Sequence, residues 1–150
     1  MWIIVRTDAR KEQYVARQII NAGFEAWHPV QVIACRPSIG RRITAKAQLV
    51  AYREIAILPR RVFCTVPVAL HAELEGIRHL VAIERNADQE AVSVPHSQIV
   101  AFRAVIDAEN TAALALSQKA SRRQKAKWRD LKEALVEMID GAKQTMEQAA

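Results

Sequence analysis

The sequence predicts an α+β fold, in which a mostly antiparallel sheet is flanked by helices and followed by an amphipathic helical extension. Short apolar runs typical of strands alternate with helical patterns over the first two thirds of the chain. Their order is strand, helix, two or three strands, short helix, strand and helix, for which mostly antiparallel pairing accounts best. From about Asn110 strand-forming residues nearly vanish. We therefore expect a domain over 1–109 and a basic, amphipathic helical extension over 110–150.

An apolar run at residues 2–5 and a glycine at position 23 predict the first strand and the end of the first helix. Trp2–Val5 is a continuous apolar run, too short for a helix and typical of a central strand. Asp8 is the expected N-cap of a first helix, which Gly23 would end. Helical spacing within it is given by Tyr14, Val15, Gln18, Ile19 and Ala22.

Prolines and basic residues mark the middle of the chain. Phe24–Ile33 predicts a strand bent at Pro29, and residues 36–48 predict a hairpin tip or a long loop that carries positive charge. Residues 48–66 return as strand around Pro59. Because a central strand has no room for the unpaired pair Arg60–Arg61, we expect this segment at an exposed end of the sheet, facing a partner.

The remaining elements follow two further prolines. Pro67 ends the preceding strand, and Val68–Leu74 predicts a short helix. Leu80–Ile83 and Val92–Val94 predict strands, and Pro95 opens a helix. The apolar face of that helix is expected to hold Ile99, Phe102, Val105 and Ile106.

The C-terminal extension carries an apolar stripe at spacings of three and four. It consists of Trp128, Leu131, Leu135, Met138, Ile139, Ala142 and Met146. An uninterrupted helix of this length would span on the order of 50 Å, too long for so small a body to cover. A break near Ser117–Ser121 and an oligomer formed through this helix are the two arrangements that remain open.

Charge and composition narrow the class of function. The 150 residues carry 22 basic and 16 acidic side chains, a net charge of +6, which favours an acidic partner such as nucleic acid or an anionic protein surface. Cys35 and Cys64 form no paired pattern and are expected to be reduced and buried. We expect no signal peptide, no membrane span and a cytoplasmic location.

Catalytic and metal-binding patterns are not found in the sequence. The four histidines have no metal-ligand spacing, and there is no P-loop or nucleophile motif. We therefore expect no enzyme, cofactor or metal. The basic run of the extension has two equal interpretations, a nucleic-acid contact or a solubilising helix face. It comprises Lys119, Arg122, Arg123, Lys125, Lys127 and Arg129.

Residues 1–106 resemble the N-terminal domain of the NusG family of transcription elongation and antitermination factors, which includes RfaH. The resemblance rests on W-I-I-V-R-T at 2–7, A-G-F-E-A-W-H-P at 22–29, the arginine-bearing hairpin, L-P-R-R-V-F at 58–63 and V-S-V-P at 92–95. It implies a bacterial, plasmid or phage protein that modulates pausing or termination, in the bacterial cytoplasm or, if phage-encoded, that of the host.

The resemblance also implies partners and contact residues. The family docks on the clamp helices of RNA polymerase, and its apolar patch corresponds here to Arg6, Leu58, Arg61, Val62, Phe63, Ile83 and Phe102. The polymerase gate loop would meet His71, Ala72 and Glu73. Upstream or non-template DNA, with RNA as an alternative, would meet Arg10, Lys11, Arg17, Arg41 and Arg42.

The chain departs from the family in two places. Arg60–Arg61 replaces the family's Gly-Tyr, and the helical extension replaces the C-terminal KOW barrel. Two roles for the stripe therefore remain open. It is either a cover over Leu58, Phe63 and Phe102, as in RfaH-like proteins, or an arm that reaches another molecule; we favour the arm. A basic nucleic-acid-binding protein that uses the fold without touching polymerase is the alternative function.

Overall fold

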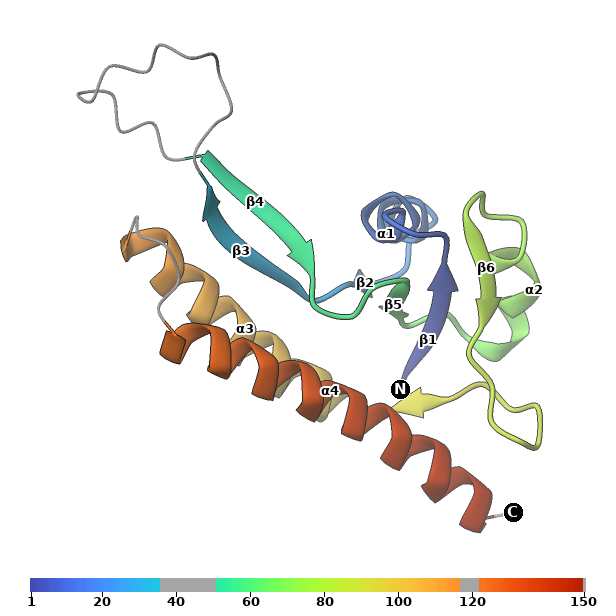
Figure 1. Ribbon diagram of the computed structural model, residues 1–150. Helices are drawn as coiled ribbons and strands as arrows, with labels where there is room; N and C mark the ends of the chain where they lie inside the picture. Colours follow the sequence, from blue (N-terminus) through green and yellow to red (C-terminus); the bar gives the residue numbers. More distant parts are fainter. Residues whose placement is uncertain (36–50, 117–121, 150) are drawn as a thin grey trace.

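The computed structural model describes residues 1–35, 51–116 and 122–149, and confirms the α+β class with antiparallel strand pairing (Figure 1). The elements are β1 (Trp2–Thr7), α1 (Glu12–Asn21), β2 (Ala26–Trp27), β3 (Val30–Cys35), β4 (Ala51–Ala56), β5 (Arg61–Cys64), a 3-10 turn (Val68–Leu70), α2 (His71–Leu74), β6 (Leu80–Ile83), β7 (Ser93–Val94), α3 (His96–Leu116) and α4 (Arg122–Ala149).

The main sheet has the order β2-β5-β1-β6, and β7 also pairs with β1. The prediction of a central first strand is confirmed, because β1 pairs with three other strands. The expectation that the segment around Arg60 and Arg61 lies at an exposed end is right for Arg60, which is exposed in the turn before β5, and wrong for Arg61, which begins an interior strand. β5 is hydrogen-bonded to β1 on one side and to β2 on the other, and the side chain of Arg61 finds a carboxylate partner.

The two faces of this sheet bury separate apolar clusters. Strand side chains alternate, so Ile4 and Phe63, opposite each other in register, face one side, whereas Val5 and Val62 face the other. The second side packs on α1 and α2, and the first on α3 and α4. Cys64 lies in the α1-side cluster, where burial raises the pKa of its thiol to about 11.

Strands β3 and β4 form a separate two-stranded ribbon, with Val30 opposite Ala56 and Cys35 opposite Ala51. The predicted strand bend at Pro29 divides β2 from β3. Asn110 of α3 fixes the ribbon, because its amide nitrogen donates to the Val30 carbonyl at 2.8 Å and its amide oxygen accepts from the Val32 N–H at 2.9 Å. The predicted hairpin tip at 36–48 lies outside the described residues.

The helix boundaries differ from the sequence prediction at one end of α1. Asp8 is not the N-cap: α1 begins at Glu12, and the Asp8 carboxylate lies 3.0 Å from Nδ1 of His79. The end is as predicted, since Gly23 follows the helix with a φ of +94°, which glycine adopts without strain. On α3, Ile99 and Ile106 are buried as predicted, whereas Val105 is exposed.

Helix α3 continues through the predicted boundary at 109/110 to Leu116, and α4 begins at Arg122. The predicted break at 117–121 lies outside the described residues. Figure 1 shows α4 running beside α3, and an ion pair between Lys127 and Glu109 joins the two helices.

Candidate functional site

The apolar stripe of α4 is packed against the α3 side of the sheet. Trp128, Leu135 and Ile139 are at most 7% exposed and lie in one cluster with Leu58 and Phe63. Phe102, Leu131, Met138 and Ala142 pack against this cluster. The stripe therefore covers the sheet in the manner of a lid, and the arm that we favoured from sequence is wrong for this conformation.

A group of charged residues joins the far half of α4 to the sheet. Glu84 lies just after β6, and its Oε1 accepts a hydrogen bond from Nζ of Lys143 on α4 at 2.6 Å. Its Oε2 forms an ion pair with Nε of Arg61 at 3.3 Å. The Glu84 side chain is only 9% exposed, and both cations are 30% exposed. Arg6 lies opposite Arg61 in register, so two like charges are neighbours on this face. We call Arg6, Arg61, Glu84 and Lys143 the charged seam.

The seven residues of the predicted patch do not form one surface. Leu58, Phe63 and Phe102 come together beneath α4, whereas Val62 and Ile83 lie in the α1-side cluster. Strand alternation is the reason, since neighbouring residues of a strand point to opposite faces. Arg61 is held in the charged seam, and the side chain of Arg6 is exposed at its edge.

The predicted gate-loop segment is divided between interior and surface. His71 is 7% exposed, and its Nε2 lies 3.1 Å from the Val66 carbonyl oxygen. Its role in this conformation is structural, because it holds α2 to the strand that precedes it. Ala72 and Glu73 are exposed, so of the three residues only these two are accessible at the surface.

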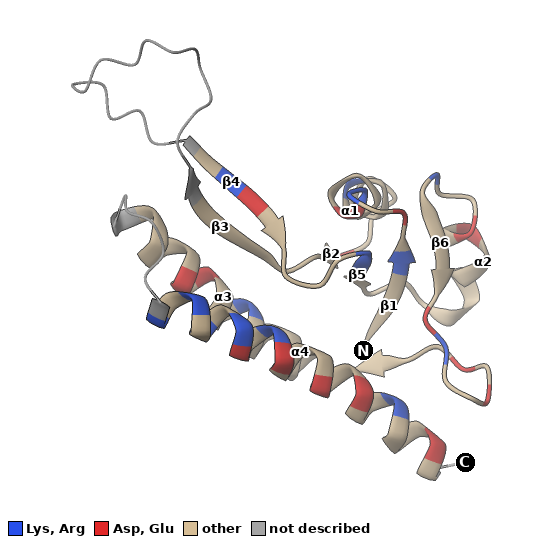
Figure 2. Ribbon diagram, in the orientation of Figure 1, with Lys and Arg blue, Asp and Glu red and all other residues tan. Residues whose placement is uncertain are grey.

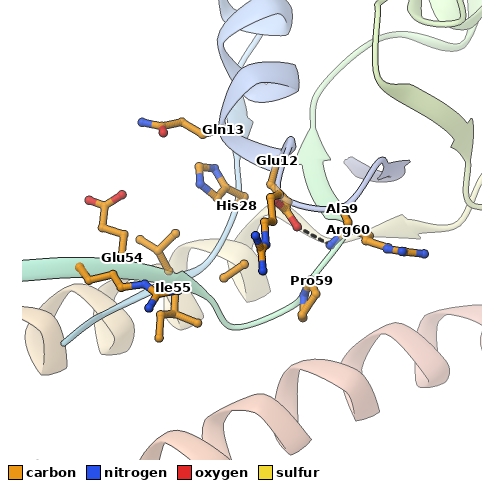
Figure 3. Close-up of a pocket in the computed structure, with 12 residues that line it drawn as sticks. Ala9, Glu12, Gln13, His28, Glu54, Ile55, Pro59 and Arg60 are labelled. Atoms are coloured by element: carbon orange, nitrogen blue, oxygen red, sulfur yellow. Dashed lines mark hydrogen bonds between the residues drawn. The ribbon is translucent and has the colours of Figure 1, made fainter. Parts of the chain in front are cut away.

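The predicted first-helix bases Arg10, Lys11 and Arg17 are all exposed, and Arg10 lines a cleft of about 510 Å³. The cleft lies between the start of α1, the turn at His28, β4 and the loop before β5 (Figure 3). Sequence reasoning did not find it, because its lining residues come from four separate segments. The charged and polar residues that line the cleft are Arg10, Glu12, Gln13, His28, Arg53, Glu54 and Arg60.

One buried carboxylate organises this cleft. Glu12 is 6% exposed, and its Oε1 accepts a hydrogen bond from the backbone N–H of Arg60 at 2.7 Å. Arg60 has a left-handed φ of 64°, a conformation that glycine favours. Burial lowers the pKa of His28, and the carboxylates of Glu12 and Glu54 oppose that shift.

Within the described residues, only some basic side chains of the extension are exposed and without an ion-pair partner on another helix. Lys127 is paired with Glu109, whereas Arg123, Lys125 and Arg129 are exposed. Of Arg122 the structure describes the backbone alone, and Lys119, Arg41 and Arg42 lie outside the described residues. Lys132, which the sequence analysis did not include, is exposed one turn beyond Arg129.

The chain matches no protein-family model, and no curated protein matches its sequence. Within 1–35, 51–116 and 122–149, no helix is both long enough and apolar enough to cross a membrane.

Proposed function

We propose that the chain is a NusG-like transcription elongation or antitermination factor, which binds RNA polymerase through the sheet face beneath α4 and modulates pausing or termination. The observation that supports this is that Leu58 and Phe63 are buried in one cluster, with Phe102 half-buried against it, and that the amphipathic helix α4 covers this cluster beside α3. When α4 is displaced, an apolar surface opens that a pair of protruding helices fits.

The way in which α4 is attached supports a cover that can be exchanged. Within the described residues it contributes no strand to the sheet, and it is held by side-chain packing and by the charged seam. Polymerase clamp helices offer the same kind of surface, an apolar helix face with acidic residues nearby. Such residues would replace Glu84 as partners of Arg61. Binding then substitutes one helix surface for another.

Binding of purified RNA polymerase to the full chain tests this proposal. Leu135→Asp with Ile139→Asp places two carboxylates in the apolar contact of α4 and should undock the helix, so affinity for polymerase should rise by roughly tenfold or more. The control is Gln144→Asp with Gln148→Asp, which adds the same charge at exposed positions of the same helix. The control should bind as the unaltered chain does.

A second substitution identifies the binding surface. Phe63 and Leu58 are too deeply buried to replace without loss of the fold, whereas Phe102 is half-buried at the border with α4. Phe102→Asp in the undocked double variant should remove the gain in affinity. If the undocked chain, shown to be folded by circular dichroism, binds polymerase no better than the control, the proposal is wrong. In a separate pull-down from cell extract, recovery of polymerase only when nuclease is omitted would favour the alternative, nucleic-acid binding without polymerase contact.

A further inference from the structure

Three exposed cations form a row along the first turns of α4, beside the face that packs on the sheet. Lys125, Arg129 and Lys132 are separated by four and three residues and therefore stand above one another on one side of the helix. Nε of Arg129 lies 3.9 Å from Oδ1 of Asp130, and both side chains are about 70% exposed, so this pair is weak. We call these three residues the α4 basic row.

The charges of α4 are arranged against the dipole of the helix. Residues 123–132 carry five bases and one acid, whereas residues 133–149 carry one base and four acids. The first turn has no acidic residue and the last has no basic one. A helix favours the opposite order, because its N-terminal end is partly positive. Figure 2 shows basic residues gathered on the early turns of α4. An anionic partner along these turns would relieve the repulsion.

The shape of the row fits duplex DNA better than an acidic protein. At 1.5 Å per residue, Lys125 and Lys132 are about 10 Å apart along the helix, the axial length over which one DNA strand passes roughly three phosphates. A protein interface would instead need an apolar centre. Among the described residues, the large apolar side chains that are exposed all lie outside α4.

We propose that the α4 basic row binds the phosphate backbone of duplex DNA while the apolar face of α4 stays docked on the sheet. The two sets of residues then have separate roles, because Trp128 and Leu135 are buried in the cluster on the sheet, whereas the three cations beside them are exposed. This inference goes beyond the proposed function, since it requires neither polymerase nor displacement of α4. The covered form of the protein is itself the DNA-binding form.

Fluorescence anisotropy with a labelled 20-base-pair duplex and the full chain tests the inference. Arg129→Gln with Lys132→Gln should weaken binding by about tenfold at low salt. It should also make the slope of log K against log salt shallower by about 1.8, or 0.9 for each lost contact. The matched control is Arg78→Gln with Arg103→Gln, which removes two exposed charges elsewhere. The control should stay within about twofold of the unaltered chain.

Hydrogen exchange on the same samples decides whether α4 stays docked. Amides of residues 128–142 should keep or gain protection when DNA is added. The inference is overturned if both double variants weaken binding equally or neither does, or if the α4 amides lose protection with DNA. It is also overturned if a single strand or poly-L-glutamate of equal charge binds as tightly as the duplex. Polymerase is not in the assay, so failure of the proposed function leaves this result unaffected.

Discussion

Replacing Lys143 by methionine removes one cation from the charged seam and keeps most of the apolar stem. Nζ of Lys143 lies 2.6 Å from Oε1 of a Glu84 side chain that is 9% exposed. A hydrogen bond to a charged group contributes about 1.5–3 kcal/mol. Lys143 is partly exposed and Arg61 stays beside Glu84, so we expect Lys143→Met to lower the free energy of unfolding by about 1–2 kcal/mol.

Glu84→Gln should have a larger effect, because it leaves Arg61 and Lys143 close to Arg6 with no carboxylate between them. Breaking a buried pair from one side costs about 3–5 kcal/mol, which partial exposure of the cations here reduces to roughly 2–3 kcal/mol. If the two residues act together, the double variant should lose less than the sum of the single losses. We expect a coupling of about 1 kcal/mol.

Urea unfolding measures these losses and their coupling in four chains: the unaltered chain, Lys143→Met, Glu84→Gln and the double variant. Lys132→Met is the matched control. Lys132 is on the same helix and exposed, and the described part of the chain offers it no carboxylate within ion-pair distance. The control should change stability by less than about 0.5 kcal/mol. Additive losses from Glu84→Gln and Lys143→Met, or an equal effect of Lys132→Met, would refute the reasoning on the charged seam.

Three further predictions concern the ribbon and the cleft. Arg60→Gly should keep or raise stability, whereas Arg60→Val should lower it by about 1–2 kcal/mol, because a β-branched residue resists a left-handed backbone; thermal unfolding of both variants checks this. Asn110→Ala should cost about 1–3 kcal/mol through the two lost ribbon hydrogen bonds and speed hydrogen exchange in β3, and unchanged exchange would contradict it. His28 has a pKa lowered by burial, so the unfolded chain binds its proton more readily, and stability should fall as the pH drops below about 6.5. His28→Gln should flatten this part of the stability curve, and an unchanged curve would rule out His28 as its source.

Most of the elements could be predicted from the sequence, because their signals are local. The run Trp2–Val5 gave the central strand, and the spacing from Trp128 to Ala142 identified the helix face that is in fact buried. The prediction of Asp8 as the N-cap was wrong, because an N-cap residue directly precedes its helix and α1 begins only at Glu12. The carboxylate of Asp8 is instead paired with a residue 71 positions away.

The candidate site was harder to predict, because it depends on pairings between distant segments. Arg61 appeared to be an unpaired charge, and only the tertiary structure brings the carboxylate of Glu84 to it, together with Lys143 as the second partner of that carboxylate. The proposed patch mixed Phe63 with Val62, although a strand sends adjacent side chains to opposite faces. The choice between cover and arm could not be made from the stripe, since either arrangement buries the same apolar area.

Hydrogen exchange of the full chain with and without RNA polymerase tests the central claim most directly. The account predicts that amides of residues 128–142 in α4 lose protection on binding, while amides of β1 and β5 remain protected because polymerase replaces the cover. Polymerase binding with α4 still fully protected would contradict the claim that this helix covers the docking surface.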